Sequence, residues 1–512
     1  MPVTPLQTRA EATQYRETST YADTMRFVTA LAEAKRVTLT TIGTTTEGRA
    51  MPLVMASHPL VTTPEQARAL GRPIVYVQAN IHAGEVEGKE AVLALLRDLT
   101  ATSVPNVLDH IVLLVEPIYN ADGNEKFRPQ AVNRQEQNGP ESVGQRANAA
   151  NLDLNRDYMK AEAPETRASL AAFAAWNPDV FVDLHTTDGS YHGYALTYSP
   201  SMAAGDDVGG YTREGLLAAV REKMKARNFS IFDYGNFETA GVRDNLLEVK
   251  KPGWSTYDWR PRFGTNYFGL RGRIAVLSEA FSHDTFERRI ASTRAFVEEI
   301  LQYTADHAVR IRAITRLADT NRKSGGRVSL RSEITKHPEM LPVLVERLVP
   351  AATPDTVTEP GVPKGIRRTG EILTQTMPVY RQFDQTLTTT LPVAYVVPDD
   401  AALLATLAVH GIAVARTTTA RNYPIETFTV STIDRAAQEF QGHRTVSLNG
   451  TWAHSNATIA VGTPLVYTAQ QLGLVAAMLL EPQSDDGLVT WNRFDDVLAA
   501  GAPFPVKRLL ER

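Results

Sequence analysis

The sequence predicts an α/β fold, with helices on both faces of a mixed, mainly parallel sheet, followed by a smaller α+β domain. Over the first 320 residues, short apolar and β-branched segments alternate with helical patterns, as expected for parallel strands linked by helices. Beyond residue 325 a different mixture of strands and helices replaces this alternation. The length of 512 residues also exceeds that of a usual single hydrophobic core, so two domains are expected.

We place a catalytic domain at residues 1–325, a connecting segment at 326–385 and an α+β accessory domain at 386–512. The connecting segment mixes charged residues with proline-marked turns, and some helix is expected in it. We expect the accessory domain to pack beside the entrance of the active site, because ligand pockets are common at domain junctions.

In the first domain, amphipathic patterns predict helices at residues 21–34, 86–100, 164–176, 213–227 and 284–320. Apolar runs predict strands at residues 37–42, 51–56, 74–77, 111–115, 180–184 and 274–277. Residues 131–151 are polar and indicate a long loop of the kind that is often functional. In the last domain we expect strands at 393–397, 427–432, 445–448 and 457–461, and helices at 399–410 and 469–480.

The composition narrows the class of function. Apolar residues make up 43% of the chain and charged residues 21%, as in an ordinary globular protein. The net charge of −4 and the lack of a Lys/Arg cluster exclude nucleic acid as the expected partner. The absence of cysteine leaves His, Asp and Glu as metal ligands.

The localisation follows from the lack of membrane signals. The sequence contains no run of eighteen apolar residues, and residues 1–30 have no apolar signal core. We therefore expect a soluble protein without a membrane span, secreted or periplasmic if a signal peptide has been removed and cytoplasmic otherwise. The sequence does not specify an oligomeric state.

Four ionisable side chains follow apolar strands of the first domain. His82 and Glu85 follow the strand at 74–77, His185 follows the strand at 180–184, and Glu279 follows the strand at 274–277. Strand ends in such sheets open onto one edge, where ligands bind. Two His and one Glu form the three-ligand set of a catalytic zinc site, and a further carboxylate nearby can act as a base. The sequence therefore predicts a metal site at this edge.

Five short motifs occur in a fixed order between residues 82 and 279. They are His82-Ala83-Gly84-Glu85, Asn120-Ala121-Asp122-Gly123, Asp153-Leu154-Asn155-Arg156, Asp183-Leu184-His185 and Glu279 within VLSEAF. With these motifs the chain resembles the zinc carboxypeptidases of the funnelin type. The resemblance covers no motif after residue 330.

The resemblance implies a role for each matched residue. His82, Glu85 and His185 would bind one zinc ion per chain, and Glu279 would be the general base.

The same resemblance implies how the substrate is held. Asn155 and Arg156 would receive its terminal carboxylate, and Asp153 would accept a hydrogen bond from a zinc-binding His.

Two further roles of the family align less directly with this sequence. The arginine that binds the oxyanion lies in the loop before D-x-N-R, where we choose Arg134, with Arg128 and Arg146 as alternatives. The family also has a mobile tyrosine before the catalytic glutamate, and Tyr267 is the residue considered for this role.

The predicted function is that of a zinc-dependent metallocarboxypeptidase, a hydrolase whose partner is a peptide or small amide with a free carboxylate. One alternative is an amide hydrolase of the same zinc chemistry, acting on acylated amino acids or cell-wall peptides. The other is a non-catalytic binding protein, although Glu279 argues against it because a binding protein needs no general base.

Overall fold

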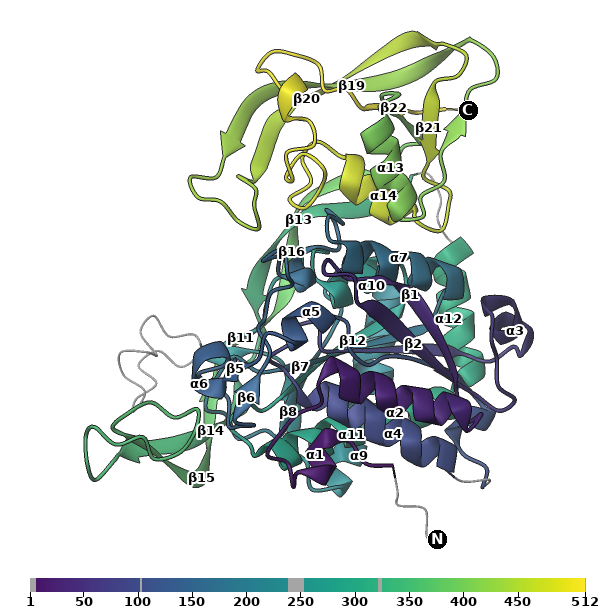
Figure 1. Cartoon of the computed structure of the whole chain (residues 1–512). Coiled ribbons are helices and arrows are strands. Elements are labelled where there is room, and N and C mark those ends of the chain that lie inside the picture. The colour runs from purple at the N-terminus through teal and green to yellow at the C-terminus, as the bar shows by residue number, and fades with distance from the viewer. Residues whose placement is uncertain (1–5, 102–103, 238–252, 321–324, 512) are drawn as a thin grey trace.

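The computed structural model describes residues 6–101, 104–237, 253–320 and 325–511 (Figure 1). The first part of the chain is built on an eight-stranded sheet. In spatial order its strands are β1 (Thr38–Thr44), β2 (Ala50–Ala56), β4 (Val112–Glu116), β3 (Ile74–Ala79), β7 (Val180–Thr186), β12 (Ile274–Ala280), β8 (Leu196–Pro200) and β9 (Ile231–Asp233). The neighbours β4–β3, β3–β7, β7–β12 and β8–β9 are parallel, and β1–β2, β2–β4 and β12–β8 are antiparallel. The predicted mixed, mainly parallel sheet is confirmed.

Helices cover both faces of this sheet, with α2, α4 and α11 on one side and α7 and α10 on the other (Figure 1). The helical segments are α1 (Arg9–Ala12), α2 (Tyr21–Glu33), α3 (Pro64–Ala69), α4 (Glu87–Ala101), η1 (Val107–Asp109), α5 (Ala121–Asn124), α6 (Gln130–Asn133), η2 (Leu154–Arg156), α7 (Pro164–Trp176), α8 (Asp206–Gly210), the π-helical η3 (Tyr211–Leu217), α9 (Ala218–Ala226), α10 (Gly264–Leu270), α11 (Phe286–Asp306) and α12 (Ala308–Thr320). The helix expected at 284–320 is therefore two helices, and α10 was not among the expected helices.

The central strands begin with apolar residues because both of their faces are buried, and their polar residues lie in their second halves. Along β3, Ile74 and Tyr76 belong to the hydrophobic cluster under α7 and α10, whereas Val75 and Val77 belong to the cluster under α4 and α11. This two-residue alternation is the pleat of a strand. It leaves the strand ends as the place where polar side chains can emerge.

Residues 325–390 form long strands instead of the helix-containing segment that we expected. They are β13 (Arg327–Lys336), β14 (Leu341–Pro350), β15 (Ile366–Met377) and β16 (Val379–Thr390). β13 pairs with β16 across more than forty intervening residues, and β14 pairs with β15 as a hairpin that projects from the body (Figure 1). Short strands complete this region and the loops before it: β5 (Arg128–Pro129), β6 (Ser142–Val143), β10 (Asn236–Phe237) and β11 (Trp254–Ser255). The prolines do mark turns. The partner of β13 is distant in sequence, however, so local patterns did not reveal its pairing with β16.

The last part of the chain is a six-stranded antiparallel sheet with two helices. Its elements are β17 (Ala394–Val396), α13 (Ala401–Val409), β18 (Ala415–Arg416), β19 (Arg421–Arg435), β20 (Val446–Ile459), β21 (Pro464–Tyr467), α14 (Gly473–Leu480), η4 (Asp495–Val497) and β22 (Lys507–Leu509). The strand expected at 457–461 is the end of β20, and the strand at 445–448 is its beginning.

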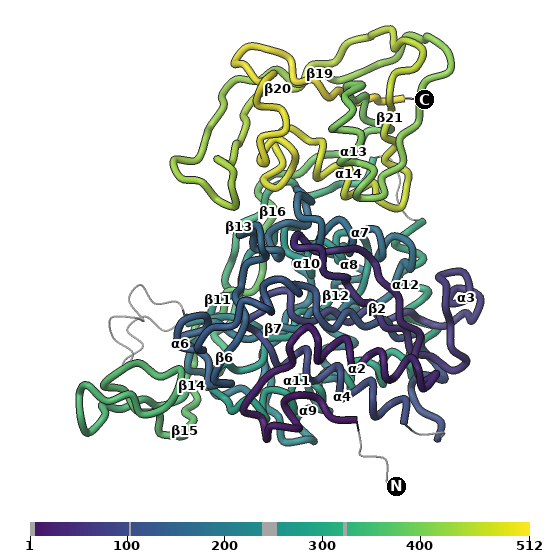
Figure 2. The backbone as a smooth tube through the Cα atoms, viewed as in Figure 1, coloured from purple at the N-terminus to yellow at the C-terminus, as the bar shows by residue number. Residues whose placement is uncertain are grey.

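The helices α13 and α14 of the C-terminal part lie against α7 and α10 of the first domain, and the C-terminal sheet lies beyond them (Figures 1 and 2). One continuous hydrophobic cluster contains Phe173 and Phe268 from the first domain and Leu407 and Leu479 from the last. The two parts therefore share a core. No helix in the described residues is both long and apolar enough to cross a bilayer.

Candidate metal and active site

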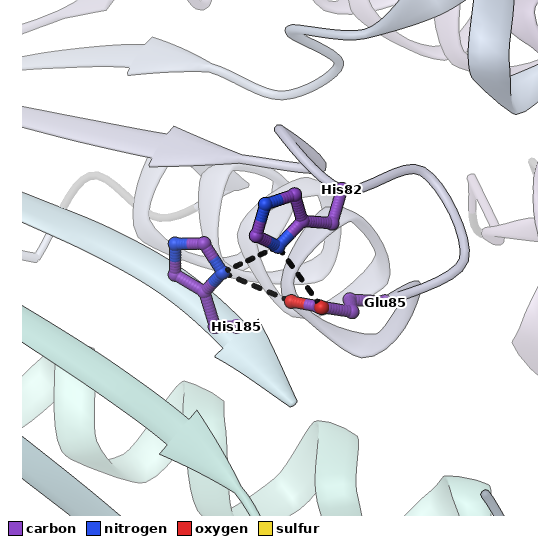
Figure 3. Close-up of side chains that lie close together, drawn as sticks. All are labelled: His82, Glu85 and His185. Carbon is purple, nitrogen blue, oxygen red and sulfur yellow. Dashed lines mark hydrogen bonds and ion pairs between the residues drawn. The ribbon is translucent and has the colours of Figure 1, made fainter. Parts of the chain in front are cut away.

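Three ionisable side chains meet at the ends of β3 and β7. His82 and Glu85 lie in the loop between β3 and α4, and His185 is the second-to-last residue of β7 (Figure 3). His82 Nδ1 is 3.0 Å from Glu85 Oε1, and His185 Nδ1 is 2.9 Å from Glu85 Oε2 and 3.2 Å from His82 Nδ1. All three side chains are at least 96% buried. The structure thus brings together the three residues predicted to bind metal.

The other nitrogen of each imidazole faces a carboxylate. His82 Nε2 lies 3.0 Å from Asp153 Oδ1, and His185 Nε2 lies 3.1 Å from Asp183 Oδ2. Because an ionised carboxylate only accepts hydrogen bonds, each Nε2 carries the proton. A metal ion at the centre of the cluster can then be bound through the Nδ1 lone pairs, in place of the protons that Glu85 would otherwise accept. Carboxylates in this position commonly orient metal-binding histidines.

This arrangement fits a zinc ion. Two imidazole lone pairs and a carboxylate facing one point repel each other unless a cation lies between them. Tetrahedral Zn²⁺ with ligands at about 2.0–2.1 Å sets the ligand atoms about 3.3 Å apart. The observed separations of 2.9–3.2 Å require an expansion of only a few tenths of an ångström.

The electrostatics also favour a cation. Burial lowers the pKa of His185, but the carboxylates of Asp183 and Glu85 outweigh this effect and raise the pKa well above its usual range. A pocket that stabilises positive charge on an imidazole in this way also stabilises a bound metal cation.

Glu279 lies beside the cluster because β12 is paired in parallel with β7, and this register sets Glu279 opposite His185. A cavity of about 110 Å³ is lined by Glu279 together with all three members of the cluster. Burial raises the pKa of the Glu279 carboxyl well above its usual range, Glu85 and Asp188 add to the effect, and His185 and Arg134 oppose it.

The three loop arginines considered for oxyanion binding occupy different places. Arg128 is exposed on β5. Arg134 is buried and donates to Glu85 Oε1 at 3.1 Å and to the carbonyl oxygens of Thr186 and Thr187. Arg146 lines the cavity. Arg134 is not among the residues that line the cavity, and its guanidinium is bound to Glu85 and to the carbonyl oxygens at the end of β7.

The position of Arg146 depends on Asp153. Arg146 Nε donates to Asp153 Oδ2 at 3.0 Å, and Arg146 Nη1 lies 3.4 Å from Glu85 Oε1. The side chain remains 38% exposed, so it can contact a molecule in the cavity. Asp153 thus orients both the His82 imidazole and the cavity arginine.

Asn155 and Arg156, the residues expected to receive the terminal carboxylate, both line the same cavity. Asn155 Oδ1 accepts a hydrogen bond from the backbone nitrogen of Gly264 at 2.8 Å, which fixes the side-chain amide. The Arg156 guanidinium lies over the ring of Phe263, with Cζ 4.1 Å from the ring centroid, and Nη1 donates to the carbonyl oxygen of Asn155. Arg156 Nη1 also lies 3.9 Å from Asp153 Oδ2, and the side chain is 22% exposed.

Tyr267, the residue considered for the role of the mobile tyrosine, is not among the residues that line the cavity. Its side chain is fully buried in α10, and its hydroxyl lies 2.7 Å from His410 Nδ1 of the last domain. Tyr234 and Tyr257 line the cavity instead. The helical geometry of α10 turns Tyr267 toward the domain interface.

Sequence reasoning also missed Asp188, which lines the cavity and accepts a hydrogen bond from the Tyr234 hydroxyl at 3.1 Å. Asp188 follows His185 by three residues at the end of β7, and Tyr234 follows the end of β9. The rule that strand ends carry functional residues was a signal available for both.

A second, larger cleft adjoins the cavity at Arg156 and Phe263, which line both. Its volume is about 640 Å³, and residues 434–436 and 445–447 of the last domain form one wall. The last domain therefore does lie beside the site.

Comparison with known proteins identifies the class. Residues 24–240 match the zinc carboxypeptidase family. Carboxypeptidase 2 of Trichophyton equinum is 24% identical over 466 residues, covering 85% of this chain and 76% of its own. Carboxypeptidase 2 of Trichophyton rubrum is 24% identical over 491 residues, covering 90% and 81%. A solved metallo-carboxypeptidase from Burkholderia cenocepacia is 20% identical, covers 57% of this chain and 70% of its own, and superposes with a TM-score of 0.41.

The protein is thus a metallopeptidase, a hydrolytic enzyme. The match to the zinc carboxypeptidase family covers residues 24–240. Glu279 lies beyond the matched residues, and its position rests on the pairing of β12 with β7.

Proposed function

We propose that the protein is a zinc-dependent carboxypeptidase that hydrolyses the C-terminal peptide bond of its substrate. The observation that carries this proposal is a single cavity lined by His82, Glu85, His185, Glu279 and Arg156. A metal site, a base and a carboxylate receptor meet there.

His82, Glu85 and His185 would hold the zinc ion through Nδ1, a carboxylate oxygen and Nδ1, respectively. Zinc in such a site polarises a carbonyl group and lowers the pKa of water toward ~7. Glu279 accepts the proton of the attacking water and returns it to the leaving amine. Its raised pKa brings the carboxyl closer to the range in which it can both take and give a proton.

Arg146 stabilises the negative charge that develops on the scissile carbonyl oxygen. Asp153 holds this guanidinium before the substrate arrives, so that little reorganisation is needed during the reaction. Removing a donor of this kind typically costs ~3 kcal/mol, or about 100-fold in rate.

Asn155 and Arg156 bind the terminal carboxylate of the substrate. A guanidinium offers a planar fork that matches a carboxylate through two parallel hydrogen bonds. The Phe263 ring beneath Arg156 keeps one face of that fork away from water. The substrate is accordingly a peptide, or a small amide, with a free carboxylate.

Two variants test the catalytic assignment together. Glu279→Gln preserves the shape of the side chain but removes the base, so we expect normal zinc content and a loss of kcat of at least about 100-fold. His185→Ala removes a ligand, so we expect loss of both zinc and activity. The readouts are metal analysis and the release of free C-terminal amino acids from a peptide library.

Near-normal turnover of Glu279→Gln would assign proton transfer to another group. Full zinc content in His185→Ala would contradict the ligand assignment. Release of acyl groups or cell-wall fragments without cleavage of C-terminal peptide bonds would favour an amide hydrolase, and zinc binding without any hydrolysis would favour a binding protein.

A further inference from the structure

We propose that the C-terminal domain completes the metal site through Gln441, a positioning residue that holds the backbone of Asp153. This inference rests on the proposed zinc site and concerns residues far outside the catalytic motifs. Gln441 lies 288 positions after Asp153 in the chain, and its Oε1 accepts a hydrogen bond from the Asp153 backbone nitrogen at 2.9 Å.

Gln441 stands at the tip of a tight turn between β19 and β20. Phe440 and His443 form a two-way backbone pair: the nitrogen of each donates to the carbonyl oxygen of the other, at 2.8 and 3.0 Å. The two residues between them have positive φ, 53° at Gln441 and 78° at Gly442, as a type I′ turn requires. Glycine and asparagine usually occupy such positions, so a glutamine there indicates a role for its side chain.

Neighbours of Gln441 also hold the turn against the first domain. His443 Nε2 lies 2.9 Å from Glu162 Oε1 of the first domain, and His443 Nδ1 lies 3.0 Å from Asn492 Oδ1 of the last domain. The Phe440 ring lies under the Arg262 guanidinium, whose Cζ is 5.5 Å from the ring centroid. These contacts of the residues on both sides of Gln441 fix the position of its side-chain amide relative to the backbone of Asp153.

Asp153 transmits this constraint to the site. Its two carboxylate oxygens bind His82 Nε2 and Arg146 Nε, each at 3.0 Å. One oxygen therefore orients a metal-binding imidazole, and the other orients the cavity arginine. A shift of the Asp153 backbone moves both groups, which gives Gln441 an effect on metal binding as well as on turnover.

The test compares one substitution that shortens the side chain of Gln441 with another that keeps its length and an acceptor oxygen. Gln441→Asn suits the positive φ, but its side chain is about 1.5 Å shorter and does not reach Asp153. Gln441→Glu keeps an acceptor oxygen at the original reach. Glu439→Gln is the control, because Glu439 lies in the same hairpin and its carboxylate pairs with Arg444, 3.7 Å away.

Zinc affinity is measured by competition with a chromogenic chelator, alongside kcat and KM on one free-acid peptide and thermal unfolding of the zinc-free protein. We expect Gln441→Asn to weaken zinc binding and to lower kcat by about fivefold to tenfold, as for loss of one hydrogen bond to a group that supports a ligand. KM and the unfolding temperature of the zinc-free protein should hardly change. Gln441→Glu should recover to within about twofold, and Glu439→Gln should match the unaltered protein.

Unchanged zinc affinity and kcat in Gln441→Asn would overturn the inference while leaving the proposed function intact. So would a Gln441→Glu protein as impaired as Gln441→Asn, or a lowered unfolding temperature that accounts for the loss. An unaltered protein that binds no zinc would instead overturn the proposed function, and this inference with it.

Discussion

Arg156 provides the sharpest test of a carboxypeptidase, because its predicted ligand is the one group that distinguishes a free C-terminus from a blocked one. The perturbation is Arg156→Gln, tested on peptides with a free terminal carboxylate and on the same peptides with an amidated terminus. Arg156→Lys keeps the charge but replaces the fork with a point charge.

The magnitude follows from the surroundings of Arg156. Its side chain is 22% exposed and lies over Phe263, so a carboxylate bound to it would be largely removed from water. A charge-assisted hydrogen bond in such a place contributes ~1.5–3 kcal/mol, which corresponds to about 10- to 150-fold in kcat/KM. The partial exposure argues against a larger effect, because solvent screens the pair.

The assay is a double cycle of two enzymes and two termini. Amidation and Arg156→Gln should each lower kcat/KM by about 10- to 150-fold, and the two together should cost little more than either alone. Arg128→Gln, which alters an exposed arginine on β5, is the matched control and should not discriminate between the two termini. Equal cleavage of free-acid and amidated peptides by the unaltered enzyme would refute the reasoning and indicate an endopeptidase or another amide hydrolase.

Two further predictions concern the roles of the loop arginines and of Tyr267. Arg146→Gln should lower kcat by about 100-fold with zinc retained, because Arg146 lines the cavity. Arg134→Gln should mainly weaken zinc binding, because Arg134 donates a hydrogen bond to Glu85. Kinetics and metal analysis of both variants are the measurements, and the reverse pattern would favour Arg134 as the group that binds the oxyanion. Tyr267→Phe leaves His410 Nδ1 buried without its donor, so we expect a loss of ~1–3 kcal/mol in the free energy of unfolding with kcat/KM unchanged; lost turnover at unchanged stability would return Tyr267 to the mechanism.

The shared hydrophobic core also affects how the C-terminal domain can be studied. Leu407 and Leu479 belong to the same cluster as Phe173 and Phe268, so deletion of the last domain would expose a large apolar surface over α7 and α10. Point substitutions such as those at Gln441 keep this core intact and are therefore the better probes of the domain.

Much of the first domain was predictable from the sequence because its signals are local. Each central strand begins with a short apolar run, because a strand with both faces buried needs apolar residues on each of them. His82 and Glu85 lie three residues apart in one loop, and His185 and Glu279 lie near the carboxyl ends of β7 and β12, so the topology of a parallel sheet was enough to gather them at one edge.

What only the tertiary structure decided are the contacts between residues distant in sequence. The loop before Asp153 carries three arginines that the sequence alone does not distinguish. Its folded path places Arg146 in the lining of the cavity. The pairing of β13 with β16, the contact of Tyr267 with His410 and the contact of Gln441 with Asp153 join segments far apart in sequence. Periodicity and spacing report which face of an element is buried, whereas the identity of the partner across that face is fixed only when the whole chain packs.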